Sequence, residues 1–421
     1  MTATTDLLDF VAAPHRLPPA VRADTLRLLA DTLAVGAAGS TAPGAAGVLA
    51  AARGWGEGGT ARILGSSERL PPANAAFING FRIHCLEWDA VHEVAVVHAL
   101  AVVTAALGVA IDAQGGCDPD EALVALAVGI DVAAGLGLAA TSPLRFFRPA
   151  TAGTIGAALA VARLVGINRD RLPDVLGLAC SACAGTMQAH VEASIALPLQ
   201  IANAARAAVG AVDLVRAGLT GPHDALEGPS GYFALFDNGD LSTYTNDLGR
   251  LWRVSEVATK PYPSGRASHG VLGVLADHPG ATKVDAYVPP LVARLVGRSM
   301  RPDMTPAYAR LCLPFLAALM LTDGRIDPRR FVPATFADSA LLALAARVAI
   351  HIDTNPDLNA LSPQRLIVDG VEIAIPATLG SPAAPLTPAQ AAAKLTLARD
   401  LALAADPRIF TDPLGYFTEI A

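Results

Sequence analysis

Acidic and basic side chains gather in one otherwise apolar stretch that ends at His98. Glu87, Asp89 and His92 precede it within a short span. An aspartate beside a histidine orients the imidazole and raises its basicity, which suits proton transfer. Asp89 and His92 are three residues apart, so they share a face if the segment is helical. The stretch predicts a proton-transfer or substrate-binding site. Structural polar residues and a metal site are the alternatives, although the H-E-x-x-H metal motif is absent.

A second group of polar side chains occupies residues 260–269, where prolines alternate with them. Each proline pushes the preceding residue into an extended conformation, so Lys260 and Tyr262 are expected to be rigid and to point in similar directions. Ser264 is expected to cap a helix that carries Arg266 and His269. A helix start flanked by Lys and Arg suits a carboxylate. The group predicts an anion site, and a proline-stiffened linker is the alternative.

A third candidate is the expected helix start around Thr151 and Gly153. Small residues there would let backbone N–H groups approach a carboxylate. The glycine pattern is not G-x-G-x-x-G and follows no strand, so it predicts no dinucleotide site. Close helix packing is the alternative reason for these glycines. The sequence also contains no G-x-S-x-G elbow and no P-loop.

The elements that position the three candidate sites are mostly helices, because helical periodicity dominates the first 250 residues. Apolar residues make up 52% of the 421 residues and charged residues only 16%, a composition far from that of disordered chains. Apolar residues at helical spacing predict helices over residues 21–36, 73–89, 98–112, 119–138, 151–165, 173–189 and 198–218.

The pattern changes after about Trp252. Short strands are expected over 284–293, 347–353 and 365–375, with a hairpin turn at Asp369-Gly370. Helices are expected between them, over 268–277, 306–322 and 338–348, and again over 388–405. The sequence therefore predicts a mainly α fold with two domains. These are a large all-helical domain over 1–255, with 388–421 packing back on it, and a smaller α+β domain over 256–387.

Charge and cysteine content limit the partners and the compartment. The net charge is −7 with no basic run, so no nucleic-acid partner is expected. The apolar stretches 94–111 and 122–140 contain polar residues and lack basic flanks, which favours buried helices over membrane spans. The start of the chain does not resemble a signal peptide. Five cysteines fit a reducing cytoplasm. The low charge predicts a homo-oligomer.

Several motifs, taken in order, resemble the MmgE/PrpD family, whose known members include 2-methylcitrate dehydratase, cis-aconitate decarboxylase and iminodisuccinate epimerase. The motifs are Ala76-Phe-Ile-Asn79-Gly80 to His98, Thr151-Ala-Gly153-Thr-Ile-Gly156, Gly218-Leu-Thr-Gly-Pro, and Lys260-Pro-Tyr-Pro. The resemblance covers most of the chain. It implies a large helical domain, a smaller α/β domain, a homodimer, and an active site in the cleft between domains that uses no metal and no cofactor.

The resemblance also points to individual residues. Glu87 and Asp89 keep two carboxylates of the family's acidic element, and His98 and Lys260 match a family histidine and lysine. Other positions depart from the family pattern because apolar or weaker groups replace its polar ones; these are Phe147 or Arg148, Leu197, Gln200 and Phe315. Loss of a lysine makes a tricarboxylate a poorer expectation than a smaller or less charged substrate.

The predicted function is that of a lyase that abstracts a proton next to a carboxylate of a small organic acid and eliminates water or carbon dioxide. His98, oriented by Asp89, is the expected base or acid, and Lys260 the carboxylate clamp or second proton carrier. The expected substrate-binding residues are Glu87, His92, Thr151, Gly153, Tyr262, Ser264, Arg266 and His269. An epimerase or isomerase, a biosynthetic enzyme for a larger and less charged intermediate, and a non-catalytic binding protein are the alternatives.

Overall fold

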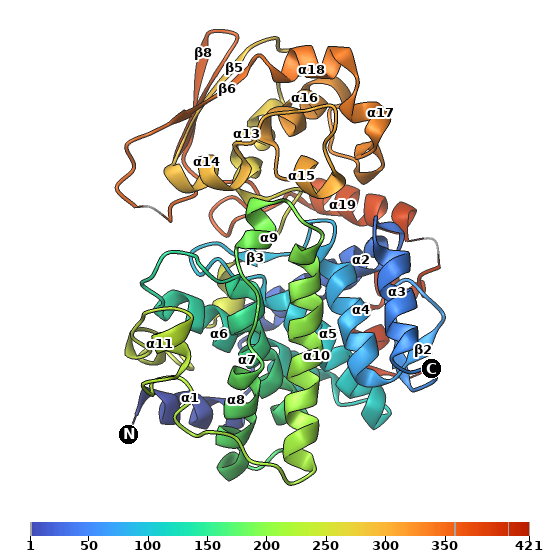
Figure 1. Ribbon diagram of the computed structural model, residues 1–421, viewed down its shortest axis with the longest axis vertical. Coiled ribbons are helices and arrows are strands. Elements are labelled where there is room, and N and C mark those ends of the chain that lie inside the picture. Colours follow the sequence, from blue (N-terminus) through green and yellow to red (C-terminus); the bar gives the residue numbers. More distant parts are fainter. Residues whose placement is uncertain (1, 358, 403, 421) are drawn as a thin grey trace.

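The computed structural model describes residues 2–357, 359–402 and 404–420 and confirms a mainly α fold (Figure 1). Long helices pack on one another in the lower part of the figure, and a small sheet with its helices lies at the top. The helices of the lower part are α1 Ala3–Ala12, α2 Pro19–Ala38, α3 Ala45–Gly54, α4 Pro72–His84, α5 Ala99–Gln114, α6 Pro119–Ala139, α7 Arg148–Leu164, α8 Leu172–Ser181, α9 Gln188–Val191, α10 Ala196–Arg216, α11 Tyr232–Leu235 and α12 Ser242–Thr245.

The helices α5 and α6 are apolar on all sides and form the centre of this part. A helix with apolar residues all round is buried in the core of a large domain or spans a membrane. Within the described residues, α6 is the one unbroken helix long and apolar enough to span a membrane, and 94% of its most apolar window is buried inside the protein. Glycines let α6 approach α7, because a Cβ on Gly156 would lie 2.4 Å from the Gly129 carbonyl oxygen.

The smaller part is built on a four-stranded sheet in the order β6-β5-β7-β8. Its strands are β5 Val284–Val288, β6 Val348–Ile352, β7 Gln364–Val368 and β8 Val371–Ile375. The hairpin expected at Asp369-Gly370 is confirmed, since Val368 pairs with Val371. Helices cover the sheet and share a second hydrophobic core with it. They are α13 His269–Leu275, α14 Pro290–Val296, α15 Pro306–Ala309, α16 Leu313–Asp323, α17 Pro333–Phe336 and α18 Ser339–Ala345.

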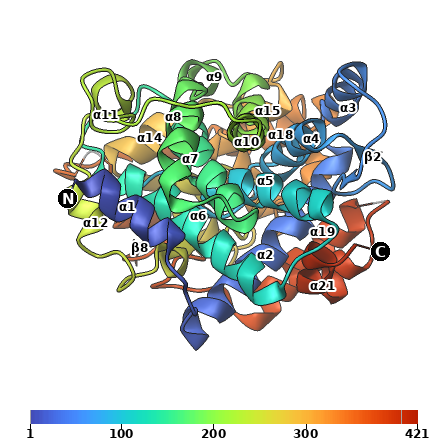
Figure 2. The ribbon, with the colours of Figure 1, turned by 90° about the horizontal axis from the view of Figure 1, so that it is seen from below.

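The C-terminal segment returns to the helical part. The helix α19 (Pro388–Leu401) packs along α2, and Ala398 and Leu401 belong to the first hydrophobic core. The short helices α20 (Arg408–Thr411) and α21 (Pro413–Thr418) also lie beside α2, as seen from below in Figure 2.

Several predicted elements differ from their expected bounds, and the helix expected over 173–189 ends at Ser181. The strand expected over 284–293 stops before Pro289-Pro290, which begin α14 instead. The helix expected over 306–322 is interrupted after Ala309 and divides into α15 and α16, with Pro314 in the first turn of α16, where a proline is tolerated because the N–H it lacks would have no partner in the helix. The helix expected over 73–89 ends at His84, and this difference shapes the active site. Short two-residue strands not expected from the sequence are β1 Ala61–Arg62, β2 Arg69–Leu70, β3 Val91–His92 and β4 Val257–Ala258.

Candidate active site

The antiparallel pair of β3 and β4 brings the first two predicted groups together. Val91 pairs with Ala258, two residues before Lys260. The chain leaves α4 at His84 and reaches α5 at Ala99 through an irregular segment. In that segment Glu87 has a left-handed φ of +53°, a conformation that costs free energy in a residue with a side chain and persists only where its surroundings hold it.

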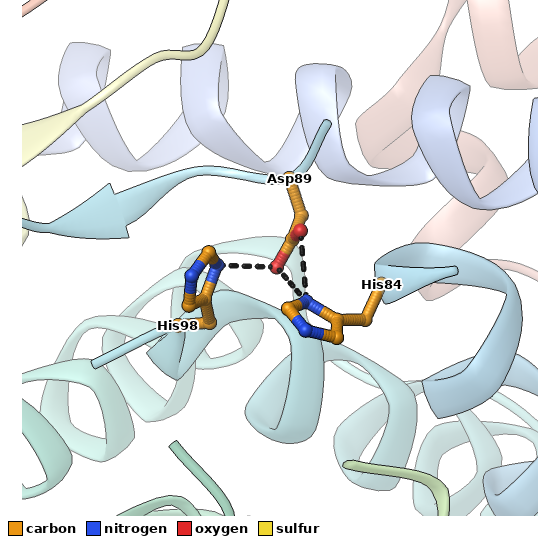
Figure 3. A group of neighbouring side chains, drawn as sticks. All are labelled: His84, Asp89 and His98. Atoms are coloured by element: carbon orange, nitrogen blue, oxygen red, sulfur yellow. Dashed lines mark hydrogen bonds and ion pairs between the residues drawn. The ribbon is translucent and has the colours of Figure 1, made fainter. Parts of the chain in front are cut away.

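Two imidazoles share the carboxylate of Asp89 (Figure 3). The Nδ1 atom of His84 lies 3.0 and 3.2 Å from the two Asp89 oxygens, and Nδ1 of His98 lies 2.9 Å from Oδ2. The ring centroids of the two histidines are 4.7 Å apart and the rings are nearly perpendicular, at 74°. An ionised carboxylate only accepts hydrogen bonds, so both Nδ1 atoms donate. Both Nε2 atoms point away from Asp89 (Figure 3), and that of His84 lies 3.5 Å from Oε1 of Glu87.

The surroundings push the pKa values of the two imidazoles in opposite directions. Burial disfavours the charged form of His84, but the carboxylates of Asp89 and Glu87 outweigh burial and raise the pKa of His84. Burial lowers the pKa of His98, and the positive charge of Lys260 acts in the same direction against the attraction of Asp89. The two imidazoles hold the pKa of Asp89 well below its ordinary value, although burial opposes them. An imidazole with a raised pKa and an imidazole with a lowered pKa therefore lie side by side, an arrangement that suits an acid and a base.

The same three side chains form the one group, within the described part of the chain, whose His and Asp ligand atoms lie close enough to hold a metal ion, all within 4.8 Å of one another. A metal needs a nitrogen lone pair, and each Nδ1 instead donates its proton to Asp89. Binding a metal there would break both hydrogen bonds. The arrangement favours proton transfer.

Lys260 lies behind this group, with 0% of its side chain exposed. Its Nζ donates to the Glu87 carbonyl oxygen at 3.0 Å and to Glu87 Oε2 at 3.2 Å. Burial alone would raise the pKa of Glu87, but Lys260, His84 and His98 lower it to about 2. The prediction that Lys260 clamps the substrate is not supported by this position, because its ammonium is paired with Glu87 and does not line the cavity beside His98.

A second buried lysine holds the next residue of the same segment. The Nζ of Lys394, on α19, donates to the Trp88 carbonyl oxygen at 3.2 Å and pairs with Asp31 of α2 at 2.6 Å. Two lysines far apart in the sequence thus bind consecutive carbonyl groups, those of Glu87 and Trp88. They stabilise the backbone conformation that carries Asp89.

A largely apolar cavity opens beside the imidazoles. His84, Glu87 and His98 line one wall of it. We call it the main cavity. Its other lining residues are mostly aliphatic or aromatic and include Val91, Val96, Leu144, Phe147, Met187, Leu197, Leu291, Leu295, Val296, Leu311 and Leu361. A substrate here meets His84, Glu87 and His98 on one side; the rest of the wall is mostly hydrocarbon, with Glu93, Arg148, His190 and Arg266 as its other polar or charged residues.

Arg266 reaches the main cavity, as expected, but its charge is already paired. Its Nε donates to Glu93 at 2.8 Å, and its other nitrogens donate to the carbonyl groups of Thr378 and Leu379. His269 does not line the cavity; it is buried against Ser264 at 3.1 Å. The predicted helix cap at Ser264 is wrong, because a 3-10 turn over Arg266–Ser268 precedes α13 and Ser264 caps neither.

His92 and Tyr262 lie outside the lining of the main cavity. The prediction that Asp89 and His92 share a helix face is wrong, because the helix ends at His84 and His92 lies in β3. His92 instead contacts Glu256, with Nε2 2.9 Å from Oε2. The ring of Tyr262 packs against His269 with centroids 5.4 Å apart.

Thr151 and Gly153 are inside α7 and serve helix packing. Thr151 is fully buried, with its hydroxyl 3.2 Å from that of Tyr232. A Cβ on Gly153 would lie 2.8 Å from Cγ2 of Val102 on α5. Neither residue lines the main cavity, so the predicted carboxylate site at this helix start is not formed.

The positions that depart from the family pattern separate into two groups. Phe147 and Leu197 line the main cavity and make it apolar, whereas Gln200 and Phe315 do not line it, and Phe315 packs in the core of the smaller part. The sequence reasoning did not select His84 as a site residue. Its signal was present, since a buried histidine five residues before Asp89 can reach the same carboxylate, but only if the helix stops between them.

Two family models match this chain. The MmgE/PrpD N-terminal domain matches residues 6–244 and the MmgE/PrpD C-terminal domain matches residues 276–407. A cis-aconitate decarboxylase of Homo sapiens is 29% identical over 312 residues, which are 70% of this chain and 64% of the relative. A cis-aconitate decarboxylase of Mus musculus is 32% identical over 216 residues, 49% of this chain and 44% of the relative.

A fungal relative, the cis-aconitate decarboxylase-like protein oryM of Aspergillus oryzae, is 27% identical over 292 residues, 65% of this chain and 60% of the relative. The chain thus spans less than two thirds of the length of these relatives. The two family models nevertheless match most of its sequence in the expected order. On this evidence the chain belongs to the MmgE/PrpD family.

Proposed function

We propose that this protein is a lyase that releases carbon dioxide from an unsaturated organic acid, with His84 as the proton donor. The observation that carries the proposal is that His84 and His98 share the carboxylate of Asp89, while Asp89 and Glu87 raise the pKa of His84 and burial lowers the pKa of His98. Its Nε2 has no hydrogen-bond acceptor and lies on the cavity wall. The names of the relatives, cis-aconitate decarboxylases, support this reaction class.

The proposed step needs one proton and no redox partner. The bond to the departing carboxylate breaks, and its electron pair forms a new carbon–carbon double bond. The electron pair of the old double bond takes the proton of His84 at the carbon next to a carboxylate that the substrate keeps. Solvent then restores the proton on His84. A carboxylate that loses its charge as carbon dioxide is destabilised in an apolar cavity before reaction, which favours the step.

Loss of water is the second candidate, because His98 lines the same cavity and burial lowers its pKa, which favours the neutral form that a base needs. In that reaction His98 removes a proton next to a carboxylate, and His84 protonates the departing hydroxyl group. Epimerisation needs proton carriers on opposite faces of one carbon. The side-by-side imidazoles, 4.7 Å apart, favour elimination instead.

The test is turnover in deuterium oxide, followed by NMR, with cis-aconitate and other unsaturated and hydroxylated acids. We expect carbon dioxide release with one deuterium next to the retained carboxylate. His84→Asn is expected to lower kcat by about 10²- to 10⁴-fold, the usual contribution of a positioned acid, and His98→Asn by less. Loss of water with a larger effect of His98→Asn would establish the second candidate. Exchange at the α-carbon without elimination would make the protein an isomerase.

A further inference from the structure

Arg310 is a buried cation that makes no direct ion pair with any described residue, although the Glu87 carboxylate is close enough to attract it. Its side chain follows α15 and is 3% exposed. Its Nε is buried without a hydrogen-bond acceptor, and no ion pair or hydrogen bond of its guanidinium occurs among the described residues. The guanidinium does make a cation–π contact with the Phe331 ring, whose centroid lies 5.4 Å from Cζ. Arginine does not lose its proton in proteins, and a buried charge without a partner costs several kcal/mol.

The guanidinium lines a small side chamber of the main cavity. His84 and Glu87 line the same chamber, and together with Leu197 and Leu311 they also line the main cavity, so the two spaces adjoin. The Nε2 of His84 is the other buried nitrogen in this wall without a hydrogen-bond acceptor, although Glu87 Oε1 lies 3.5 Å away. Two residues that each carry a buried nitrogen without a hydrogen-bond acceptor therefore line one chamber. On its other side, Arg310 borders a separate cavity next to Phe331 that does not reach His84.

The other cations near the imidazoles are already paired. Arg148 binds Asp237 through two nitrogens, at 3.0 Å each. Arg266 pairs with Glu93, and Lys260 with Glu87. None of these three is available for a substrate carboxylate without breaking a buried ion pair.

Arg82 and Arg298 also lack a carboxylate partner among the described residues, but neither lines the side chamber or the main cavity. Arg82 is buried and donates to the Leu64 carbonyl oxygen. Arg298 is partly exposed and donates to the His190 carbonyl oxygen. Arg310 is therefore the unpaired cation that a reactant beside His84 can reach.

The charges around the side chamber leave room for one anion. The cations are Lys260, His84 and Arg310, and the carboxylates are Glu87 and Asp89. Glu87 is paired with Lys260, and Asp89 binds both imidazoles, so no described carboxylate contacts the guanidinium of Arg310 directly. A carboxylate in the chamber would supply that partner.

We propose that Arg310 binds the carboxylate that the substrate keeps, and that the site binds no further carboxylate by ion pairing. The place of the reacting carbon rests on the proposed function: a carboxylate on Arg310 brings the adjacent carbon to His84. The substituent on the middle carbon then meets the hydrocarbon wall formed by Phe147 and Leu197. The substrate class is a pent-2-enedioate with an apolar group at carbon 3, where cis-aconitate carries a third carboxylate.

A binding experiment tests Arg310 without requiring turnover. The probes are hexanoate, with one carboxylate and an apolar tail, and tricarballylate, with three carboxylates, each titrated calorimetrically into the full chain. We expect hexanoate to bind more tightly. Arg310→Met should weaken hexanoate binding by about 10- to 100-fold, the range for a hydrogen bond to a charged group, whereas the exposed Arg347→Met should leave it unchanged. Equal hexanoate binding by Arg310→Met, or tighter tricarballylate binding by the natural protein, would overturn the inference.

Thermal unfolding separates a binding role from a structural one. An unpaired buried charge destabilises the empty protein, so Arg310→Met should raise Tm or leave it unchanged in the absence of ligand. Hexanoate should raise the Tm of the natural protein and not that of the variant. A variant that is destabilised or fails to fold would make Arg310 a structural residue and would contradict the inference.

Turnover of a matched pair distinguishes this inference from the proposed function. The pair is 3-methylpent-2-enedioate and cis-aconitate, which differ in a methyl group against a carboxylate. We expect a higher kcat/KM for the methyl compound, and a rise in KM larger than the fall in kcat in Arg310→Lys. Faster turnover of cis-aconitate would refute the inference and leave the lyase proposal intact. Arg310-dependent hexanoate binding without turnover of any acid would refute the lyase proposal alone.

Discussion

The ammonium of Lys260 lies 3.0 Å from the carbonyl oxygen and 3.2 Å from the carboxylate of Glu87, and none of its side chain reaches solvent. The lysine therefore holds both the backbone and the side chain of a residue whose φ is +53°. This contact fixes the turn between α4 and Asp89. Its effect on catalysis is indirect, through the position of Asp89.

Removal of this ammonium should destabilise the fold. Lys260→Met leaves the Glu87 carboxylate buried without its counter-ion, which is expected to lower the free energy of unfolding by about 3 kcal/mol. Urea unfolding measures the change. The matched control is Lys283→Met, because Lys283 is 70% exposed and such ion pairs contribute at most about 1 kcal/mol. If Lys260→Met had unchanged stability and a raised KM, Lys260 would instead be a residue that binds the substrate carboxylate.

Glu87 should make stability depend on pH in the acid range. Its pKa is lowered from 4.5 to about 2, so the stability it contributes is present above pH 4.5 and is lost as the pH falls through about 2. The shift corresponds to about 3 kcal/mol. Urea unfolding of the natural protein and of Glu87→Gln should therefore differ most above pH 4.5, with the difference shrinking below it. A difference that stays constant down to pH 2 would show that Glu87 is not held ionised.

Asp89→Asn should impair catalysis while keeping the shape of the site. The amide cannot accept both Nδ1 protons as a carboxylate does, and it removes the charge that raises the pKa of His84. We expect kcat to fall by about 10²- to 10⁴-fold near neutral pH, with part of the activity recovered at lower pH. The measurement is the pH profile of kcat for the variant. A uniform loss at all pH values would indicate a structural role for Asp89.

The pH profile of the natural enzyme should distinguish the two candidate reactions. Release of carbon dioxide needs a charged His84, whose pKa is raised above 6.5, so kcat/KM should fall only as the pH rises above that value. Loss of water also needs a neutral His98, whose pKa is lowered below 6.5, so it adds an acid limb below that value. The measurement is kcat/KM from initial rates across the pH range in which the protein is stable. A fall at high pH alone indicates release of carbon dioxide, and a fall at both low and high pH indicates loss of water.

Local patterns in the sequence were enough to predict the helices and the sheet. The apolar periodicity of α5, α6 and α10 predicts them within a few residues, and the turn at Asp369-Gly370 predicts the β7–β8 hairpin. The contact between Asp89 and His98 was predictable too, because the two residues are close in the sequence. Such features depend on neighbours along the chain.

The rest of the site depends on contacts between distant residues. Lys260 and Lys394 bind Glu87 and Trp88 from positions 173 and 306 residues further along the chain. Helical periodicity alone predicts that α4 continues to Asp89. A helix of that length would put His92, and not His84, beside the Asp89 carboxylate. Local sequence also gives no sign that Arg310 is buried without a partner, because that depends on every segment packed around it.

The protonation states of the two imidazoles test the central claim most directly and need no substrate. The chain has nine histidines, so ¹⁵N-histidine labelling gives a small set of NMR signals, which His84→Asn and His98→Asn assign. At pH 6.5 we predict that both nitrogens of His84 carry a proton, whereas Nε2 of His98 does not. The reverse assignment, with a charged His98 and a neutral His84, would contradict the account.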